Sequence, residues 1–149
     1  MSAAVRICVG ALILNPLGQV FVQRRAPTAA VWPGVWDIVG GHLEPGETVH
    51  DALRREVWEE TGWQVSVVLG TVGEYAYRGN DGLDRVETDF LVRVDGDLRR
   101  PRLEAGKHTG FRWLAEHELA VLDEDREVND GLIRRIAEDG FAALHRIGL

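Results

Sequence analysis

Apolar residues in this chain of 149 residues fall into short runs, separated by turns that are rich in glycine, proline and asparagine. Residues 5–14 are nearly continuously apolar, as expected of a central strand that is covered on both faces. Alternating apolar residues or flanking turns predict further strands at residues 19–25, 36–39, 64–78, 85–94 and 110–114. The turn at residues 79–82, Gly-Asn-Asp-Gly, is a strong signal for a hairpin between two of these strands.

Two other segments show the spacing of apolar residues that is typical of helices. The first helix is predicted at residues 49–61, with Thr48 as its N-cap and Gly62 as its end. The second is predicted at residues 125–139 and ends at Gly140; its apolar face consists of Val128, Leu132, Ile133, Ile136 and Ala137. Strands interspersed with two main helices favour an α/β or α+β fold, with a mixed sheet sandwiched between helices.

Three glutamates of the first predicted helix lie on or beside its apolar side. At about 100° per residue from the start of the helix, Glu56 lies at roughly 340°, Glu59 at roughly 280° and Glu60 at roughly 20°. The apolar stripe spans roughly 300° to 80° on the same wheel. Like charges repel at this spacing, and a partly buried carboxylate is costly unless a positive charge compensates it. A hard divalent cation such as Mg²⁺ or Mn²⁺ would supply that charge, whereas the alternative interpretation is an acidic, solvated helix face.

Residues 41–63, GHLEPGETVHDALRREVWEETGW, resemble the Nudix box, the signature of the Nudix hydrolases. The residues that match its pattern are Gly41, Glu47, Arg55, Glu56, Val57, Glu59, Glu60 and Gly62. Trp63 departs from the pattern, because it is aromatic at a position where an aliphatic residue is usual. The resemblance implies the Nudix α/β/α sandwich, formed by a single domain over residues 1–149. It also implies hydrolysis of a diphosphate bond in a nucleoside diphosphate linked to another group.

The chemistry of diphosphate hydrolysis suggests roles for the glutamates. Divalent metals bridge phosphate oxygens, and glutamates at i, i+3 and i+4 supply three hard oxygen ligands from one helix face. We therefore expect Glu56 and Glu60 to be the primary ligands of Mg²⁺ or Mn²⁺, with Glu59 completing the cluster. By the resemblance, the carbonyl group of Gly41 is a further metal ligand.

The resemblance also implies that Arg55 pairs with Glu47 and braces the loop before the helix, whereas the alternative is a weak surface salt bridge. With these two, the candidate catalytic residues are Glu47, Arg55, Glu56, Glu59 and Glu60. One of these glutamates, or a residue outside the box, takes the proton from the attacking water.

Many Nudix proteins add a carboxylate from later in the chain, but Lys107 stands where we would expect it. Glu87 and Asp89 alternate on one strand and are the better geometric candidates, although we favour solvent-facing positions on an edge strand for both. Glu104 and His108 are also candidates, and we favour ordinary loop positions for them.

Residues that bind the substrate should lie outside the box. Arg25 is a candidate for binding phosphate, and Trp36 and Tyr77 are candidates for stacking on a base. Packing roles are the alternative for the two aromatic residues.

Composition narrows the class of partner and the compartment. A formal net charge of −7 argues against nucleic-acid or anionic-membrane partners, so we expect a small-molecule substrate of the nucleotide type. The single cysteine, Cys8, excludes an internal disulfide and favours a reducing, cytoplasmic setting. Its apolar surroundings predict a buried core thiol. The sequence is also compatible with a homodimer.

Two other functions are compatible with the resemblance. One is an isomerase of isopentenyl diphosphate, since such enzymes share the fold and a phosphate-handling metal site, but they alter the box and use a placed cysteine. The other is a non-catalytic nucleotide sensor, but such sensors tend to lose box glutamates and are longer. The complete REVWEE cluster at residues 55–60 favours hydrolysis.

Overall fold

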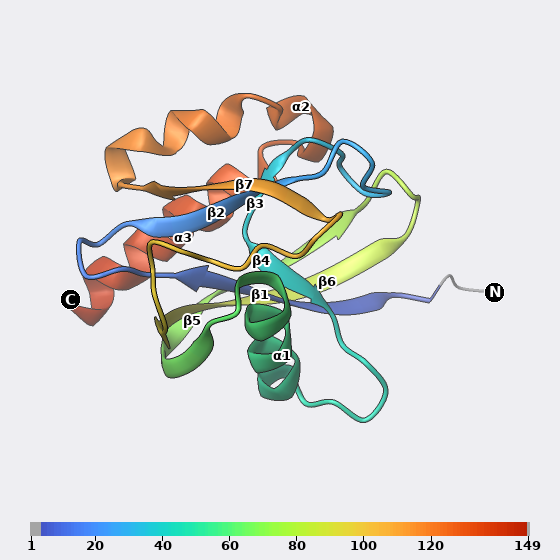
Figure 1. Cartoon of the computed structure of the whole chain (residues 1–149). Coiled ribbons are helices and arrows are strands. Elements are labelled where there is room, and N and C mark those ends of the chain that lie inside the picture. The colour runs from blue at the N-terminus through green and yellow to red at the C-terminus, as the bar shows by residue number, and fades with distance from the viewer. Residues whose placement is uncertain (1–3, 149) are drawn as a thin grey trace.

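The computed structural model describes residues 4–148 and arranges them in two sheets with helices around them (Figure 1). In chain order, the strands are β1 (Arg6–Ile13), β2 (Val20–Arg25), β3 (Trp36–Asp37), β4 (Val39–His42), β5 (Gln64–Arg78), β6 (Asp84–Asp95) and β7 (His108–Leu114). The helices are α1 (Val49–Thr61), the 3-10 helix η1 (Glu116–Asp123), α2 (Arg126–Asn129) and α3 (Leu132–Ile147). Within residues 4–148, no helix combines the length and the apolar character needed to cross a membrane.

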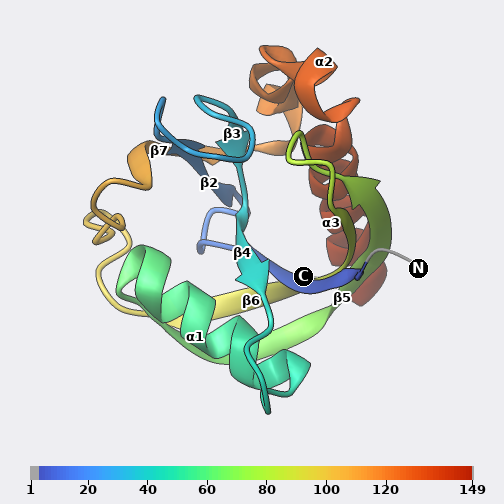
Figure 2. The ribbon, with the colours of Figure 1, turned by 90° about the vertical axis from the view of Figure 1, so that its right-hand side faces the viewer.

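The larger sheet has the strand order β4-β1-β6-β5 and is mixed, because β1 pairs in parallel with β6 and antiparallel with β4. The smaller sheet has the order β3-β2-β7 and is antiparallel. Helix α1 packs on one face of the larger sheet and α3 on the other (Figure 2). This arrangement confirms the predicted α/β fold with a mixed sheet between helices.

Strand β1 is the centre of the hydrophobic core. Val9, Ala11 and Ile13 belong to the apolar cluster that includes α1, whereas Leu12 belongs to the cluster that includes α3. None of these four side chains is more than 1% exposed. A strand that is covered on both faces has no solvated side, which explains why residues 5–14 are nearly continuously apolar.

Helix α1 has the predicted bounds, and local interactions fix both of its ends. The Thr48 hydroxyl accepts a hydrogen bond from the Asp51 backbone N–H at 3.1 Å, and the Asp51 carboxylate accepts one from the Thr48 N–H at 3.1 Å. Gly62 ends the helix with a φ of 75°, a left-handed conformation that favours glycine. The next residue, Trp63, is 2% exposed and packs edge-on against Phe21, so the aromatic residue at this box position fills the core.

The C-terminal helical region differs from the single helix predicted at residues 125–139. Helix α2 is one turn long, and the chain then changes direction through Asp130 and Gly131, whose φ angles are 56° and 69°. Val128 was predicted on the apolar face but is 49% exposed. The prediction failed because the helical spacing of apolar residues continues past Asp130 and Gly131, where the backbone conformation interrupts the helix.

Gly140 does not end the helix, contrary to the prediction. It is buried within α3, at the point where this helix lies against β1. A Cβ atom at Gly140 would overlap the side chain of Leu12, which is itself fully buried. This glycine therefore permits close packing between the helix and the sheet, and the αL residue that ends α3 is Gly148.

We predict that Gly140→Ala destabilises the protein, although alanine favours helices by about 1 kcal/mol over glycine. Overpacking a close core contact should lower the free energy of unfolding by about 1–3 kcal/mol, measured by chemical denaturation. In a Leu12→Ala background the same change should cost less, because the overlapping atoms are gone. A Gly140→Ala protein that is more stable than the wild type would contradict this packing role.

Candidate functional site

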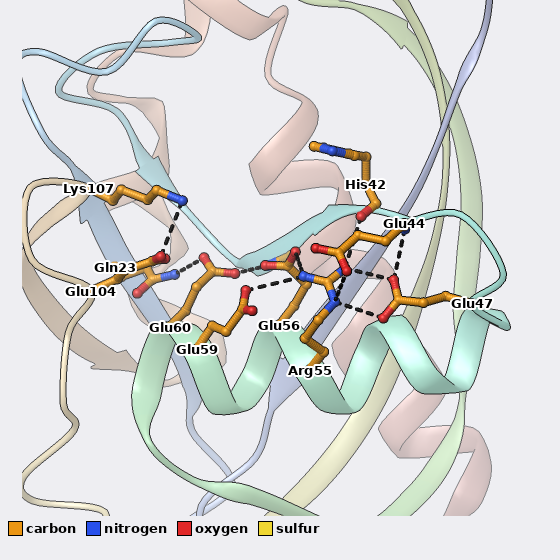
Figure 3. A network of polar contacts seen from close by, with 11 residues as sticks. Gln23, His42, Glu44, Glu47, Arg55, Glu56, Glu59, Glu60, Glu104 and Lys107 are labelled. Atoms are coloured by element: carbon orange, nitrogen blue, oxygen red, sulfur yellow. Dashed lines mark hydrogen bonds and ion pairs between the residues drawn. The ribbon is translucent and has the colours of Figure 1, made fainter.

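Arg55 on α1 is the centre of an ion-pair network that joins the helix to the preceding loop (Figure 3). Its Nε and one terminal nitrogen donate to both oxygens of Glu47, at 2.7 and 2.8 Å. Its other terminal nitrogen donates to Glu56 at 2.7 Å and to Glu59 at 3.1 Å. The terminal nitrogen that contacts Glu47 also donates to the His42 carbonyl oxygen, at 3.1 Å. Hydrogen bonding from Arg55 lowers the pKa of Glu47 to about 2. The structure thus contains the Arg55–Glu47 pair that the resemblance implied.

Glu56 and Glu60 form a pair of adjacent carboxyl groups beside the end of β4 (Figure 3). Glu60 is 4% exposed, and its two oxygens accept hydrogen bonds from the Gln23 amide at 2.7 Å and from the Gly40 N–H at 3.0 Å. Burial, and then the contact with Glu56, raise the pKa of Glu60 well above its usual value. The solvated-face interpretation therefore fails for Glu60, while Glu59 is 42% exposed at its side chain.

Gly41 allows β4 to approach this pair closely. A Cβ atom at Gly41 would lie 2.6 Å from the Glu56 carboxyl carbon, which is closer than van der Waals contact permits. Gly41 pairs with Val9 in the sheet, so the position of its backbone is fixed by the register of β4 on β1. Only glycine therefore fits between this strand and the Glu56 side chain.

The donor set around this pair fits a hard divalent cation. Glu56, Glu59, Glu60 and the Gly41 backbone offer oxygen donors, which suit Mg²⁺ or Mn²⁺. Among residues 4–148, no three His, Cys, Asp or Glu side chains already converge as a ready-made metal site. One nitrogen of Arg55 contacts both Glu56 and Glu59. A cation bound by these glutamates would compete with that nitrogen for their oxygens, whereas the bonds from Arg55 to Glu47 involve other nitrogens.

A pocket of about 450 Å³ extends from the carboxyl pair, a volume typical of small-molecule sites. Residues at its α1 end are Gly40, Gly41, Glu56, Glu60, Lys107 and His108. Residues from the loop after β2 and from β3, β5 and β6 line the rest, among them Trp32, Asp37, Tyr77 and Glu87. The predicted metal ligands Glu56 and Glu60 therefore face a space large enough for a small ligand.

Three polar residues near β7 border the same pocket. Lys107 pairs with Glu104 at 3.2 Å, so a positive charge stands where an auxiliary carboxylate was expected. His108 lies 3.6 Å from Glu60, but burial lowers its pKa to about 4. The imidazole is therefore neutral at pH 7, and its contact with Glu60 is not an ion pair.

Glu87 and Asp89 do not lie on an edge strand, contrary to the favoured interpretation. Strand β6 is between β1 and β5, and the two side chains are 9% and 0% exposed. Tyr77 donates a hydrogen bond to Glu87 at 2.8 Å. Burial, and then the charge of Glu87, raise the pKa of Asp89 well above its usual value. Local alternation cannot reveal which strands flank β6, and so the prediction failed.

The three predicted substrate-binding residues have different positions. Tyr77 lines the pocket, and so does Arg25, which also contacts Asp37 at 3.4 Å. Trp36 is not part of the lining; its indole N–H donates to Glu124 at 3.1 Å. Asp37 had no predicted role, although it borders the pocket and burial raises its pKa to about 6. Its only signal in the sequence was a single carboxylate in a short apolar strand.

A family model described as the NUDIX domain matches residues 4–136. The chain belongs to the NUDIX domain family. The solved MutT protein from Methanosarcina mazei Go1 has this fold with a TM-score of 0.78, over 95% of this chain and 96% of that one, at 24% identity. The fold implied by the resemblance is thereby confirmed.

Relatives of this NUDIX protein have more than one activity in their names. Isopentenyl-diphosphate Delta-isomerase from Kocuria rhizophila is 39% identical over 117 residues, which are 75% of this chain and 63% of the isomerase. Nucleoside triphosphatase NudI from Salmonella agona is 40% identical over 128 residues, which are 79% of this chain and 87% of that protein. The chain therefore spans less than two thirds of the isomerase and most of the triphosphatase.

We predict that Arg55 and Glu47 stabilise the NUDIX protein as a pair. Arg55→Gln and Glu47→Gln should each lower the melting temperature by about 2–6 °C, and the double variant should lose less than the sum. Arg54→Gln, at an exposed position on the same helix, is the matched control and should change the melting temperature little. Strictly additive losses would show that the two side chains do not act together.

We further predict that Asp89 makes the protein less stable as pH rises. Because the folded-state pKa is raised, the unfolded chain loses its proton first, from about pH 4 upward, and the free energy of unfolding then falls. An asparagine side chain cannot ionise, so the stability gained by Asp89→Asn should grow between about pH 4 and pH 7 in denaturation experiments. Asp95→Asn, at the exposed end of the same strand, is the control. A gain that is constant with pH would mean that Asp89 is charged in the folded protein.

Proposed function

We propose that this protein hydrolyses a phosphoanhydride bond of a nucleotide or nucleotide derivative with the help of Mg²⁺ or Mn²⁺. The observation that supports the proposal most strongly is the pair of adjacent carboxyl groups, Glu56 and Glu60, at one end of a pocket of about 450 Å³. Such a pair is costly to bury without a compensating cation. The name of the triphosphatase relative, which matches over most of its length, agrees with this substrate class.

The residues of the site would hold the metal and the substrate in the following way. Glu56 and Glu60 would hold the cation, together with Glu59 and the Gly41 carbonyl group. When bound, a divalent ion neutralises phosphate charge and lowers the pKa of water. The Gln23 amide and the Gly40 N–H orient the Glu60 carboxyl group, since each bonds one of its oxygens.

Other side chains would complete the reaction. Arg55 keeps Glu47 and the loop before α1 in place, so that the orientation of the helix against β4 is fixed. Lys107 and Arg25 both line the pocket and would attract the phosphate groups. A carboxylate of the α1 cluster would accept the proton of the attacking water. In this scheme, each of the candidate catalytic residues has a role in positioning charge around the phosphates.

Isomerisation of isopentenyl diphosphate is the second candidate, and the 39% identity to an isomerase favours it. Cys8, the only cysteine of the chain, borders the pocket. However, burial raises the pKa of its thiol to about 11, so that it is a neutral, weakly reactive group at pH 7. The complete glutamate cluster also favours hydrolysis, and we therefore place isomerisation second.

The experiment that separates these activities is a substrate panel with Mg²⁺ or Mn²⁺. It comprises nucleoside triphosphates, dinucleoside polyphosphates, ADP-ribose, NADH, nucleotide sugars and isopentenyl diphosphate. We expect metal-dependent release of phosphate, pyrophosphate or a nucleoside monophosphate from a nucleotide. Conversion of isopentenyl diphosphate without any nucleotide hydrolysis, and its loss in Cys8→Ser, would replace the proposal with the isomerase.

We predict that Glu60→Gln lowers the turnover of the best nucleotide by at least about 10²-fold and leaves the fold intact, because it removes a charged ligand. The metal-free variant should melt at a higher temperature than the wild type, since the repulsion between the two carboxyl groups is gone. Glu74→Gln, at an exposed position on β5, is the control and should keep full activity. Near-wild-type turnover of Glu60→Gln at limiting metal would rule out the assigned metal site.

A further inference from the structure

The part of the pocket remote from α1 contains a second group of buried polar residues. It is formed by the hairpin of β5 and β6 and by the loop that follows β2, which lie side by side in Figure 1. The Asn80 side chain joins them, because its oxygen accepts a hydrogen bond from the Trp32 N–H at 3.0 Å and its nitrogen donates to the Ala30 carbonyl at 3.3 Å. The proposed phosphate chemistry uses none of these residues.

Glu87 borders the pocket, together with Tyr77, Asp81 and Arg85 of the same hairpin. One of its oxygens accepts the hydrogen bond from Tyr77, whose pKa is raised by burial and then by the charge of Glu87. Tyr77 therefore remains a phenol and always donates. Arg85, on the same strand, donates its hydrogen bonds to both oxygens of Asp81 and not to Glu87. Glu87 is thus a fixed hydrogen-bond acceptor in the wall of the pocket.

Asp89 lies two residues beyond Glu87 on the same strand, deeper in the protein. It is fully buried, and neither of its oxygens has a hydrogen-bond donor among the described residues. In the sheet it is flanked by Gly10 and Gly73, and its oxygen occupies the space that a Cβ at Gly10 would fill. Two neighbouring carboxyl groups can share a hydrogen bond only if one of them keeps its proton. Burial, and then the charge of Glu87, raise the pKa of Asp89, so Asp89 is the member of the pair that keeps its proton.

Trp32 forms an apolar wall beside this acceptor. Its ring packs on that of Tyr77, with centroids 5.3 Å apart, and it is 4% exposed. The backbone φ of Trp32 is 47°, a region that is strained for a bulky residue and that occurs most often at functional sites. The indole nitrogen has no hydrogen-bond partner among the described residues. Two aromatic rings next to a buried carboxylate resemble a site for a flat, polar ring more than a site for phosphate.

The charges that border this end of the pocket are mixed, because Arg6 and Arg85 line it as well as acidic residues. Asp37 and Glu87 border it, and Asp89 lies beneath it. Next to Glu87, a phosphate group would face an acidic oxygen, whereas an N–H group would find an acceptor.

We propose that Glu87, held by Tyr77 and backed by Asp89, recognises the amino group of a nucleobase whose ring packs against Tyr77 and Trp32. The inference rests on the proposed function only in taking the ligand to be a nucleotide. The preferred ligand is a base with an exocyclic –NH₂, because a carbonyl oxygen in the same place would direct its lone pairs at the carboxylate. Glu87 is a specificity residue in this account, and Asp89 is a positioning residue.

The test is a comparison of binding constants, measured by calorimetry, for nucleoside triphosphate analogues with imido groups at both bridging positions, so that neither anhydride bond can be cleaved. The pairs are CTP with UTP, ATP with ITP, and GTP with ITP, which differ in one amino group. In at least one pair, the wild type should bind the amino compound about tenfold or more tightly, and Glu87→Gln should reduce that ratio to within about threefold. Glu74→Gln is the matched control on the neighbouring strand and should keep the wild-type ratio.

Two further variants test the same ratio independently, in case Glu87→Gln does not fold. Tyr77→Phe keeps the ring and removes the donor, so the ratio should fall at least about threefold while Glu87 remains. Asp89→Asn keeps a donor toward Glu87 and should preserve the ratio. Equal binding of all partners by the wild type, or a Glu87→Gln protein that weakens every analogue by the same factor, would overturn the proposal. Because imido analogues are not cleaved, a base preference without any hydrolysis would instead contradict only the proposed function.

Discussion

The adjacent carboxyl groups of Glu56 and Glu60 are the constraint around which the rest of this site is organised. Two like charges in contact at a buried position are strongly unfavourable, and several groups offset that cost. The Gln23 amide and the Gly40 N–H bond Glu60, while Arg55 bonds Glu56. A divalent cation between the pair would compensate both charges at once, and so the same arrangement that is costly without metal favours tight metal binding.

Strand register then determines what can surround the pair. Because β1 lies between β4 and β6, it places Gly41 against Glu56 on one face of the sheet. On the same strands, Gly10 lies opposite both Gly40 and Asp89, and the lack of a side chain at Gly10 accommodates that carboxyl group. Gly41 and Gly10 thus allow both acidic pairs of the pocket, Glu56–Glu60 and Glu87–Asp89, to pack closely against the same sheet. The site and the hydrophobic core therefore depend on the same pairings.

Sequence patterns correctly predicted the features that depend on residues close together in the chain. The bounds of α1 follow from Thr48 and Gly62, and the position of Glu60 on the buried side follows from helical periodicity. Features that depend on distant partners could not be predicted in this way. Gly140 was taken for a helix end because the packing of α3 on Leu12 is not visible in sequence spacing, and Glu87 was placed on an edge strand because β5 and β1 flank it only in the folded sheet. Trp36 was expected near the substrate, but the position of its side chain depends on Glu124, 88 residues away.

The central claim is that the Glu56–Glu60 pair, now partly neutralised by Arg55, binds a divalent cation. Crystals of the protein soaked in Mn²⁺ and measured at the manganese absorption edge test it most directly. We expect an anomalous peak in contact with Glu56, Glu60 and the Gly41 carbonyl, with the Arg55 nitrogen withdrawn from Glu56 and the bonds from Arg55 to Glu47 retained. A fully occupied manganese peak elsewhere, with Arg55 still bonded to Glu56, would contradict it.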